Sequence, residues 1–163
     1  MMHKPYCEAL GSCMWVQVAT HPDIPFAVSV LSHFQSNPGP AHWTAMLHLL
    51  AYLKGSINYK ISYSWGGDLA PIGFVDADYA GDIDTCCSTS GYVFTIAGGP
   101  VSWKGHAHAK HIDIRHHYIR KHISNGEIKV VQVPSEDNLV DLLTKPLNCV
   151  THQKLVRALK MDL

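Results

Sequence analysis

The sequence has no excess charge of either sign, because 13 lysines and arginines balance 13 aspartates and glutamates in 163 residues. This balance excludes a long-range field that would draw the chain to nucleic acid or to a membrane surface at neutral pH. Any binding to a polyanion must therefore depend on a local group of basic side chains.

Paired cysteines and long apolar runs are also missing. The five cysteines are odd in number and show no CxxC spacing, so neither a disulfide framework nor a zinc ribbon is indicated. The first residues, MMHKPYCEALGSCMW, contain no apolar run long enough for a signal peptide or a membrane span. We expect a reducing, intracellular location, cytoplasmic or nuclear, and no membrane partner.

What is present is enough apolar sequence, 47%, to build the core of one ordinary domain. Helical spacing of apolar residues predicts helices over 23–34 and 41–55. Alternation then predicts strands over 57–64, 71–79, 90–98 and 100–104, with a turn at Gly98 and Gly99. A His-rich helix over 110–123, a strand over 127–134, a helix after Ser135 and a final helix over 151–160 should follow.

Two motifs in this β region, GFVDADYAGD (73–82) and STSGYVFTIAGGPVSWK (88–104), resemble the ribonuclease H region of the Pol polyprotein of copia-type LTR retrotransposons. Four further blocks agree in order, namely ATHPDI (19–24), YLKG (52–55), KHIDIRHHYIR (110–120) and VDLLTKPL (140–147). The resemblance implies an α+β fold, a truncated ribonuclease H-like mixed sheet. Its parts would be a three-stranded antiparallel meander, a later strand and an N-terminal helical segment.

The same resemblance implies a division of the chain. Residues 1–56 correspond to the helical connection that follows a reverse transcriptase. Residues 57–104 and 105–148 correspond to the two parts of the ribonuclease H-like domain, and 149–163 to a tail helix.

Members of the resembling family hold two divalent ions with four carboxylates and cleave the RNA strand of an RNA/DNA hybrid. Asp76 and Asp141 match two of these four, and would be the catalytic and metal-binding residues. A carboxylate amid GFV on a strand also favours a nearby cation on physical grounds. Residues expected to contact nucleic acid are Ser88, Thr89, Ser90, Lys104 and Arg115.

The sequence departs from the family directly after Lys104, where GHAHAKHID follows. The family has there a segment that supplies the second and third metal ligands and a central strand. Two aspartates could hold one Mg²⁺ weakly, so Mg²⁺ should be weakly bound or lost and hydrolysis absent. Removal of that segment should also leave one apolar face of the sheet open to water. Either a genomic deletion or an error in the gene model would explain the missing segment.

Six of the twelve histidines lie between Gly105 and His122, which raises the alternative of a His-rich metal-binding module. A closed zinc site needs four converging ligands. The sequence KHIDIRHH is also common in the resembling family, so its histidines need no metal to explain them. His21, His33, His48 and His108 stand where that family commonly has arginine, which suggests decay by cytosine deamination. A further alternative is an active hybrid ribonuclease whose missing carboxylates come from a partner chain, another Pol chain or a reverse transcriptase.

Overall fold

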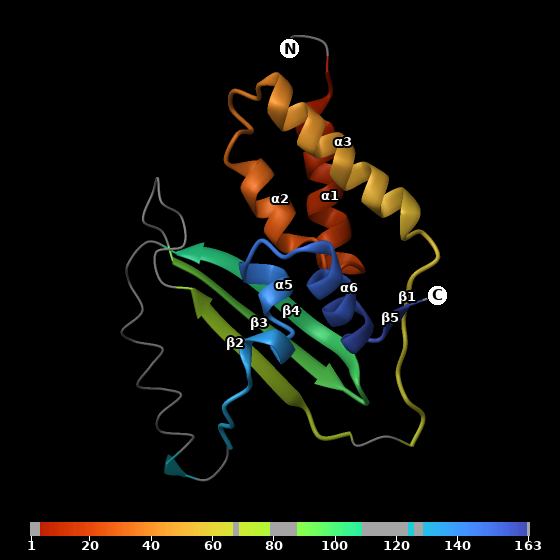
Figure 1. Ribbon diagram of the computed structural model, residues 1–163, viewed down its shortest axis with the longest axis vertical. Coiled ribbons are helices and arrows are strands. Elements are labelled where there is room, and N and C mark those ends of the chain that lie inside the picture. Colours follow the sequence, from red (N-terminus) through yellow and green to blue (C-terminus); the bar gives the residue numbers. More distant parts are fainter. Residues whose placement is uncertain (1–3, 67–68, 79–87, 109–123, 126–128, 163) are drawn as a thin grey trace.

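The computed structural model describes residues 4–66, 69–78, 88–108, 124–125 and 129–162. It is an α+β protein in which a group of helices stands at one side of a small antiparallel sheet (Figure 1). The expected fold class is therefore confirmed. Within the described part, no helix is both long and apolar enough to cross a membrane.

The helical group consists of α1 (Tyr6–Ala19), α2 (Pro25–Ser32) and α3 (Pro40–Gly55). Helices α2 and α3 lie where the sequence predicts them, and each has proline near its first turn, where no N–H is needed. Helix α1 was not predicted, although its buried residues recur at helical spacing. They are Tyr6, Leu10 and Cys13.

The sheet has the order β2-β3-β4, all antiparallel, with β2 (Ile72–Asp78), β3 (Ser88–Ile96) and β4 (Gly99–His108). The predicted meander is confirmed, but its tight turn lies one residue earlier than expected, at Ala97 and Gly98. Both residues have positive φ, 53° and 82°, which is what a two-residue hairpin loop with the twist of the strands requires.

Two predicted strands differ from the structure. The alternating stretch 57–64 forms only the two-residue β1 (Lys60–Ile61), which pairs with β5 (Met161–Asp162) at the other end of the chain. Residues 129–134 have no regular structure, and Val130 and Val131 are about two-thirds exposed. Alternation shows only that a segment can form a strand, whereas a strand also needs a neighbour for its backbone hydrogen bonds.

The C-terminal part covers one face of the sheet with the 3₁₀ turn η1 (Ser135–Asp137), α5 (Asp141–Thr144) and α6 (Cys149–Ala158) (Figure 1). The helix expected after Ser135 is thus a 3₁₀ turn and a single α-helical turn. Helix α6 agrees with the predicted tail helix, and Asn148 caps it by accepting a hydrogen bond from the Thr151 N–H at 2.9 Å.

The described residues form two apolar cores. One lies among α1, α2 and α3, and the other joins the covered face of the sheet to α5, α6 and β5. Trp103 of β4 links them, because its indole N–H donates to the carbonyl oxygen of Gln17 in α1 at 2.7 Å. The His-rich helix predicted for 110–123 lies outside the described residues.

Candidate functional site: a lysine between two carboxylates

The structure brings together Asp76 and Asp141, the two carboxylates that the sequence singled out. Asp76 lies in β2 and points toward α5, where the Thr144 hydroxyl donates a hydrogen bond to its Oδ2 at 2.7 Å. Asp141 is the first residue of α5, and its side chain is 6% exposed. Residues 65 positions apart thus share one site on the covered face of the sheet.

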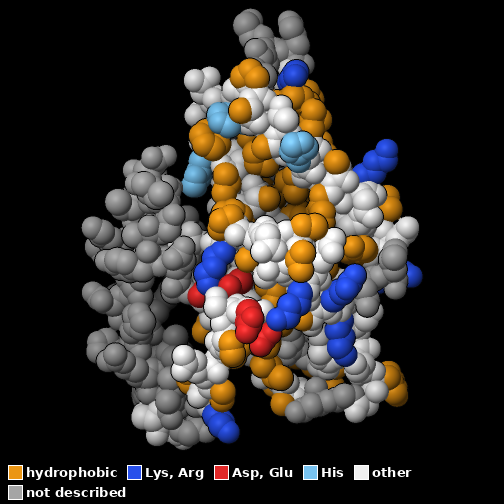
Figure 2. All heavy atoms as spheres, in the orientation of Figure 1, with side chains coloured by type: hydrophobic (Ala, Val, Ile, Leu, Met, Phe, Trp, Pro, Cys, Tyr) orange, Lys and Arg blue, Asp and Glu red, His pale blue; other side chains and the backbone are white. Residues whose placement is uncertain are grey.

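A lysine occupies the space between these carboxylates. The Lys145 ammonium nitrogen lies 3.0 Å from Oδ1 of Asp141 and 3.3 Å from Oδ2 of Asp76. Burial alone would lower the pKa of Lys145, but the hydrogen bonds and charges of Asp141 and Asp76 outweigh it and raise that pKa. Acidic and basic side chains gather in the middle of the face in Figure 2, over the C-terminal elements.

Short polar contacts fix the segment before α5. The Ser135 hydroxyl donates to Oδ2 of Asp141 at 3.0 Å. The Asn138 side-chain amide donates to the carbonyl oxygen of Val75 at 3.3 Å, so this segment is attached to β2 itself. The Asp141 carboxylate is therefore held by Ser135, which precedes it in the chain, and by Lys145, which follows it.

Two glycines allow α5 to lie so close to the sheet. A Cβ on Gly91, the residue paired with Asp76 across β2 and β3, would lie 2.8 Å from Cγ1 of Val140. A Cβ on Gly105 would lie 3.1 Å from the carbonyl oxygen of Leu143. Side chains at these positions would push α5 away and separate Asp141 from Asp76.

The described residues that were predicted to contact nucleic acid do not all lie on the face of this site. Thr89 shares the face of Asp76, because residues at even spacing along a strand point the same way. Ser90 and Lys104 point to the opposite face, in register with Tyr92 and its neighbours. The side chain of Ser88 and the whole of Arg115 lie outside the described part.

That opposite face is partly apolar and carries no described helix over it. Val75 is 71% exposed and Phe94 is 42% exposed, and the rings of Tyr92 and Phe94 are in contact with centroids 5.5 Å apart. This agrees with the expectation that one face of the sheet is open to water.

The donors that the structure describes do not fit the pair of metal ions that the resembling family uses. In the described residues, no three side chains of histidine, cysteine, aspartate or glutamate converge as ligands. Two carboxylates supply two negative charges, and Lys145 already offsets one of them, whereas two divalent ions bring four positive charges.

Sequence reasoning missed Lys145, Thr144 and Ser135. The spacing of Asp141 and Lys145 by four residues is a signal for an ion pair on a helix, and could have indicated Lys145. No local pattern indicates that Thr144 reaches Asp76, because this contact exists only after the chain has folded.

A second polar cluster lies among the helices, around the fully buried carboxylate of Asp23. His21 contacts one oxygen at 3.0 Å, and the Tyr52 hydroxyl donates to the other. Burial, followed by the charge of Asp23 and this hydrogen bond, raises the pKa of Tyr52 strongly. His152 of α6 lies edge-on to Tyr52 and contacts the backbone oxygen of Asp23 at 3.2 Å, so this cluster ties α6 to the helical group.

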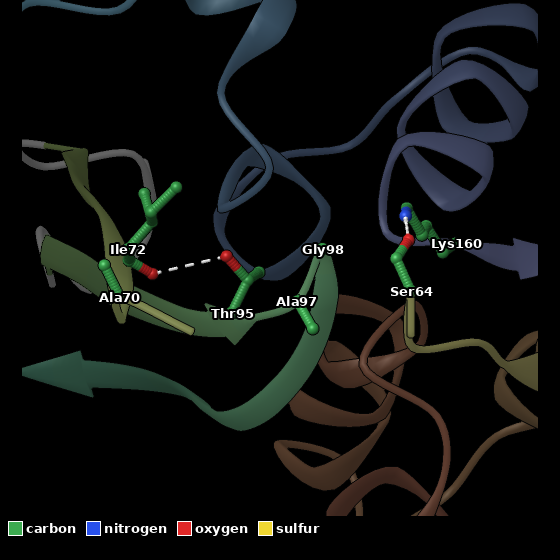
Figure 3. A pocket seen from close by; sticks show the side chains of 7 residues that line it. All are labelled: Ser64, Ala70, Ile72, Thr95, Ala97, Gly98 and Lys160. Carbon is green, nitrogen blue, oxygen red and sulfur yellow. Dashed lines mark hydrogen bonds between the residues drawn. The ribbon is translucent and has the colours of Figure 1, made fainter. Parts of the chain in front are cut away.

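Two hollows of the surface lie away from the Asp76–Asp141 site. One of about 240 Å³ lies at the β3–β4 turn, where the Thr95 hydroxyl donates to the Ile72 carbonyl and Lys160 donates to Ser64 (Figure 3). An apolar hollow of about 370 Å³ lies between α2 and α3 beside Tyr52. The lining residues of neither include Asp76 or Asp141.

Comparison with known proteins supplies the relatives of this chain. It is 31% identical to the Retrovirus-related Pol polyprotein from transposon TNT 1-94 of Nicotiana tabacum, over 205 positions that include 89% of this chain and 15% of that protein. It is 28% identical to the polyprotein from transposon RE2 of Arabidopsis thaliana, over 213 positions, 93% of this chain and 15% of that protein. It is also 43% identical to Secreted RxLR effector protein 161 of Plasmopara viticola, over 64% of this chain and 73% of that protein.

The chain therefore belongs to one family with Secreted RxLR effector protein 161, and it is a homologue of retrovirus-related Pol polyproteins from transposons, with about 30% identity over about 90% of its length. It spans about 15% of the length of these polyproteins. Alignments of 205 and 213 positions exceed the 163 residues of this chain, so the polyproteins contain residues without a counterpart here. No family model and no solved structure matches the chain.

Proposed function

We propose that this chain is the ribonuclease H-like part of a copia-type Pol polyprotein, reduced to a form that contacts RNA/DNA hybrids without cleaving them. Asp76 and Asp141 take the positions of two family metal ligands, and Mg²⁺ is bound weakly or not at all. The polyprotein alignments contain more positions than this chain has residues, which supports the loss of a segment from this chain. We place the lost segment after Lys104, where the family motifs break off.

The proposal that the chain does not cleave RNA depends on the arrangement of charges at the site. Lys145 offsets one of the two negative charges of Asp76 and Asp141, a hydroxyl group donates a hydrogen bond to each carboxylate, and no third described carboxylate joins them. The mechanism of the resembling family stabilises the attacking and leaving oxygens of the phosphodiester with two closely spaced divalent ions, which this set cannot hold.

The faces of the sheet give a second reason. Lys104 and Ser90 point away from Asp76, so a duplex held on that face would not present its phosphate to the two carboxylates. Lys104 is exposed and would neutralise one phosphate, while Tyr92 and Phe94 beside it offer ring surface.

The cleavage test uses an RNA/DNA hybrid labelled on its RNA strand, with Mg²⁺, with Mn²⁺ and with EDTA. We expect no product above the EDTA blank for the natural chain. Asp76→Asn and Asp137→Asn form a matched pair, because Asp137 lies at the surface, paired with Lys154 at 2.8 Å. Metal-dependent cleavage that Asp76→Asn abolishes and Asp137→Asn leaves intact would mean that the chain is an active ribonuclease.

Binding is tested separately by fluorescence anisotropy of a labelled hybrid at several salt concentrations. Lys104→Ala should weaken binding and reduce the slope of log K against log salt by about 1, the contribution of one phosphate contact. Lys54→Ala, an exposed lysine at the end of α3, is the control and should leave the slope unchanged. Equal effects of both variants would contradict a hybrid-binding face on the sheet.

A further inference from the structure

The ammonium group of Lys145 has the contacts that a bound cation would otherwise make. Its nitrogen has three N–H donors, and three oxygens lie within reach of it. These are Oδ1 of Asp141 at 3.0 Å, Oδ2 of Asp76 at 3.3 Å and Oγ of Ser135 at 3.4 Å.

The local backbone directs Lys145 into this position. Helix α5 ends at Thr144, and Lys145 is extended, with φ −130° and ψ 149°. Thr144 and Lys145 are adjacent, yet both reach Oδ2 of Asp76, so two successive side chains close over one carboxylate. The side chain of Lys145 is 31% exposed, whereas that of Asp141 is 6% and that of Asp76 17% exposed, so the lysine is the most exposed of the three.

The two carboxylates need a positive partner, because a buried charge without one is strongly unfavourable. Mg²⁺ binds oxygen at about 2.0–2.1 Å, much closer than the distances of 3.0 and 3.3 Å to the Lys145 nitrogen. An ion that contacted both carboxylates would have to take the place of the ammonium group, so lysine and metal exclude each other.

We infer that Lys145 is the resident cation of the Asp76–Asp141 site, holding α5 on the sheet without metal and blocking divalent ions until it is removed. Lys145 is thus a positioning residue that substitutes for a metal ion. The inference rests on the proposed function only in assigning Asp76 and Asp141 to the family's metal-binding positions. The experiment that tests it contains no nucleic acid. A chain that does not bind RNA/DNA hybrids would therefore contradict the proposed function but not this inference.

The test is thermal unfolding of the full chain in EDTA and in 10 mM MgCl₂. The natural chain should melt at the same temperature in both buffers. Lys145→Met should melt lower in EDTA and recover by about 3 °C or more in Mg²⁺, because a ligand that binds only the folded state stabilises it. Lys145→Arg, which keeps the charge, should again be indifferent to Mg²⁺.

Two further variants make the result specific. Lys154→Met removes the exposed ion pair with Asp137 and should show no response to Mg²⁺. The double variant Asp141→Asn, Lys145→Met should lose the recovery, because one of the two oxygen donors has lost its charge. A natural chain that gains as much from Mg²⁺ as Lys145→Met, or a folded Lys145→Met that gains nothing, would overturn the inference.

If Lys145→Met does not fold in either buffer, the inference is tested by measuring the binding of Mn²⁺ to the natural chain by electron paramagnetic resonance. Lack of binding at millimolar Mn²⁺ supports a site closed by Lys145. Binding of one ion with a Kd below about 1 mM that Asp76→Asn abolishes would overturn it.

Discussion

Gly91 and Val140 lie so close together that the Cβ which glycine lacks would be 2.8 Å from Cγ1 of the valine. Gly91 is paired with Asp76 across the sheet, and Val140 directly precedes Asp141. The separation of the two carboxylates is therefore set by a contact between their neighbours.

Gly91→Ala should destabilise the chain by about 1–3 kcal/mol, because the new methyl group enters a packed contact between α5 and β3. Adding Val140→Ala should restore part of this loss by removing the clashing methyl. Urea unfolding measures both. Gly11→Ala is the control, since a Cβ there meets nothing within 4 Å in the middle of α1, and it should stabilise by about 0.5–1 kcal/mol. The same sign for Gly91→Ala and Gly11→Ala would contradict the close packing.

Ala97→Asn should stabilise the β3–β4 hairpin by about 0.5–1 kcal/mol, because Ala97 has a φ of 53° and asparagine tolerates this left-handed conformation better. Thermal unfolding measures the change. Ala51→Asn, at an exposed position of α3, should instead be slightly unfavourable, since asparagine is a poorer helix former. A loss of stability in Ala97→Asn would speak against this turn.

Thiol reactivity should divide the cysteines by burial. Cys13 is 1% exposed and burial raises its pKa, whereas Cys7 and Cys149 are exposed. In a chain with Cys86 and Cys87 replaced by serine, Cys13 should react with a disulfide reagent slower than the other two by on the order of tenfold or more. Peptide mapping identifies each site, and urea should equalise the rates. Equal rates without urea would contradict the burial of Cys13 in the core among the helices.

Stability should fall above about pH 10, where an unfolded tyrosine loses its proton but Tyr52, whose pKa is raised in the folded state, keeps it. A raised pKa stabilises the folded state fully below the unfolded value, and this contribution is lost as the pH rises toward the folded one. Burial and the charge of Cys7 raise the pKa of Tyr6 in the same sense.

Tyr52→Phe should flatten this alkaline loss and cost about 1–3 kcal/mol at pH 7, because the buried Asp23 loses a donor. Urea unfolding from pH 7 to 11 measures both effects. Tyr63→Phe, whose hydroxyl donates to the Pro100 carbonyl at a half-exposed site, should retain the alkaline slope. A slope that is unchanged in Tyr52→Phe would show that Tyr52 does not contribute to it.

The sequence alone indicated those features that depend on neighbours along the chain. Helices α2, α3 and α6 follow from apolar spacing and from their capping or proline residues, and the meander follows from alternation around a glycine turn. The motifs also singled out Asp76 and Asp141 before any geometry was known. The strand predicted over 127–134 is absent from its described part, residues 129–134, because alternation of apolar residues does not supply a partner strand.

Tertiary structure alone decided what surrounds those two carboxylates. Lys145 lies only four residues from Asp141, but its second partner, Asp76, is 69 positions away and meets it only when α5 packs against Gly91. The orientation of Ser90 and Lys104 away from Asp76 likewise depends on strand register, which a single sequence does not display. Local propensity thus determines which elements form, whereas close packing between distant segments decides which charges meet.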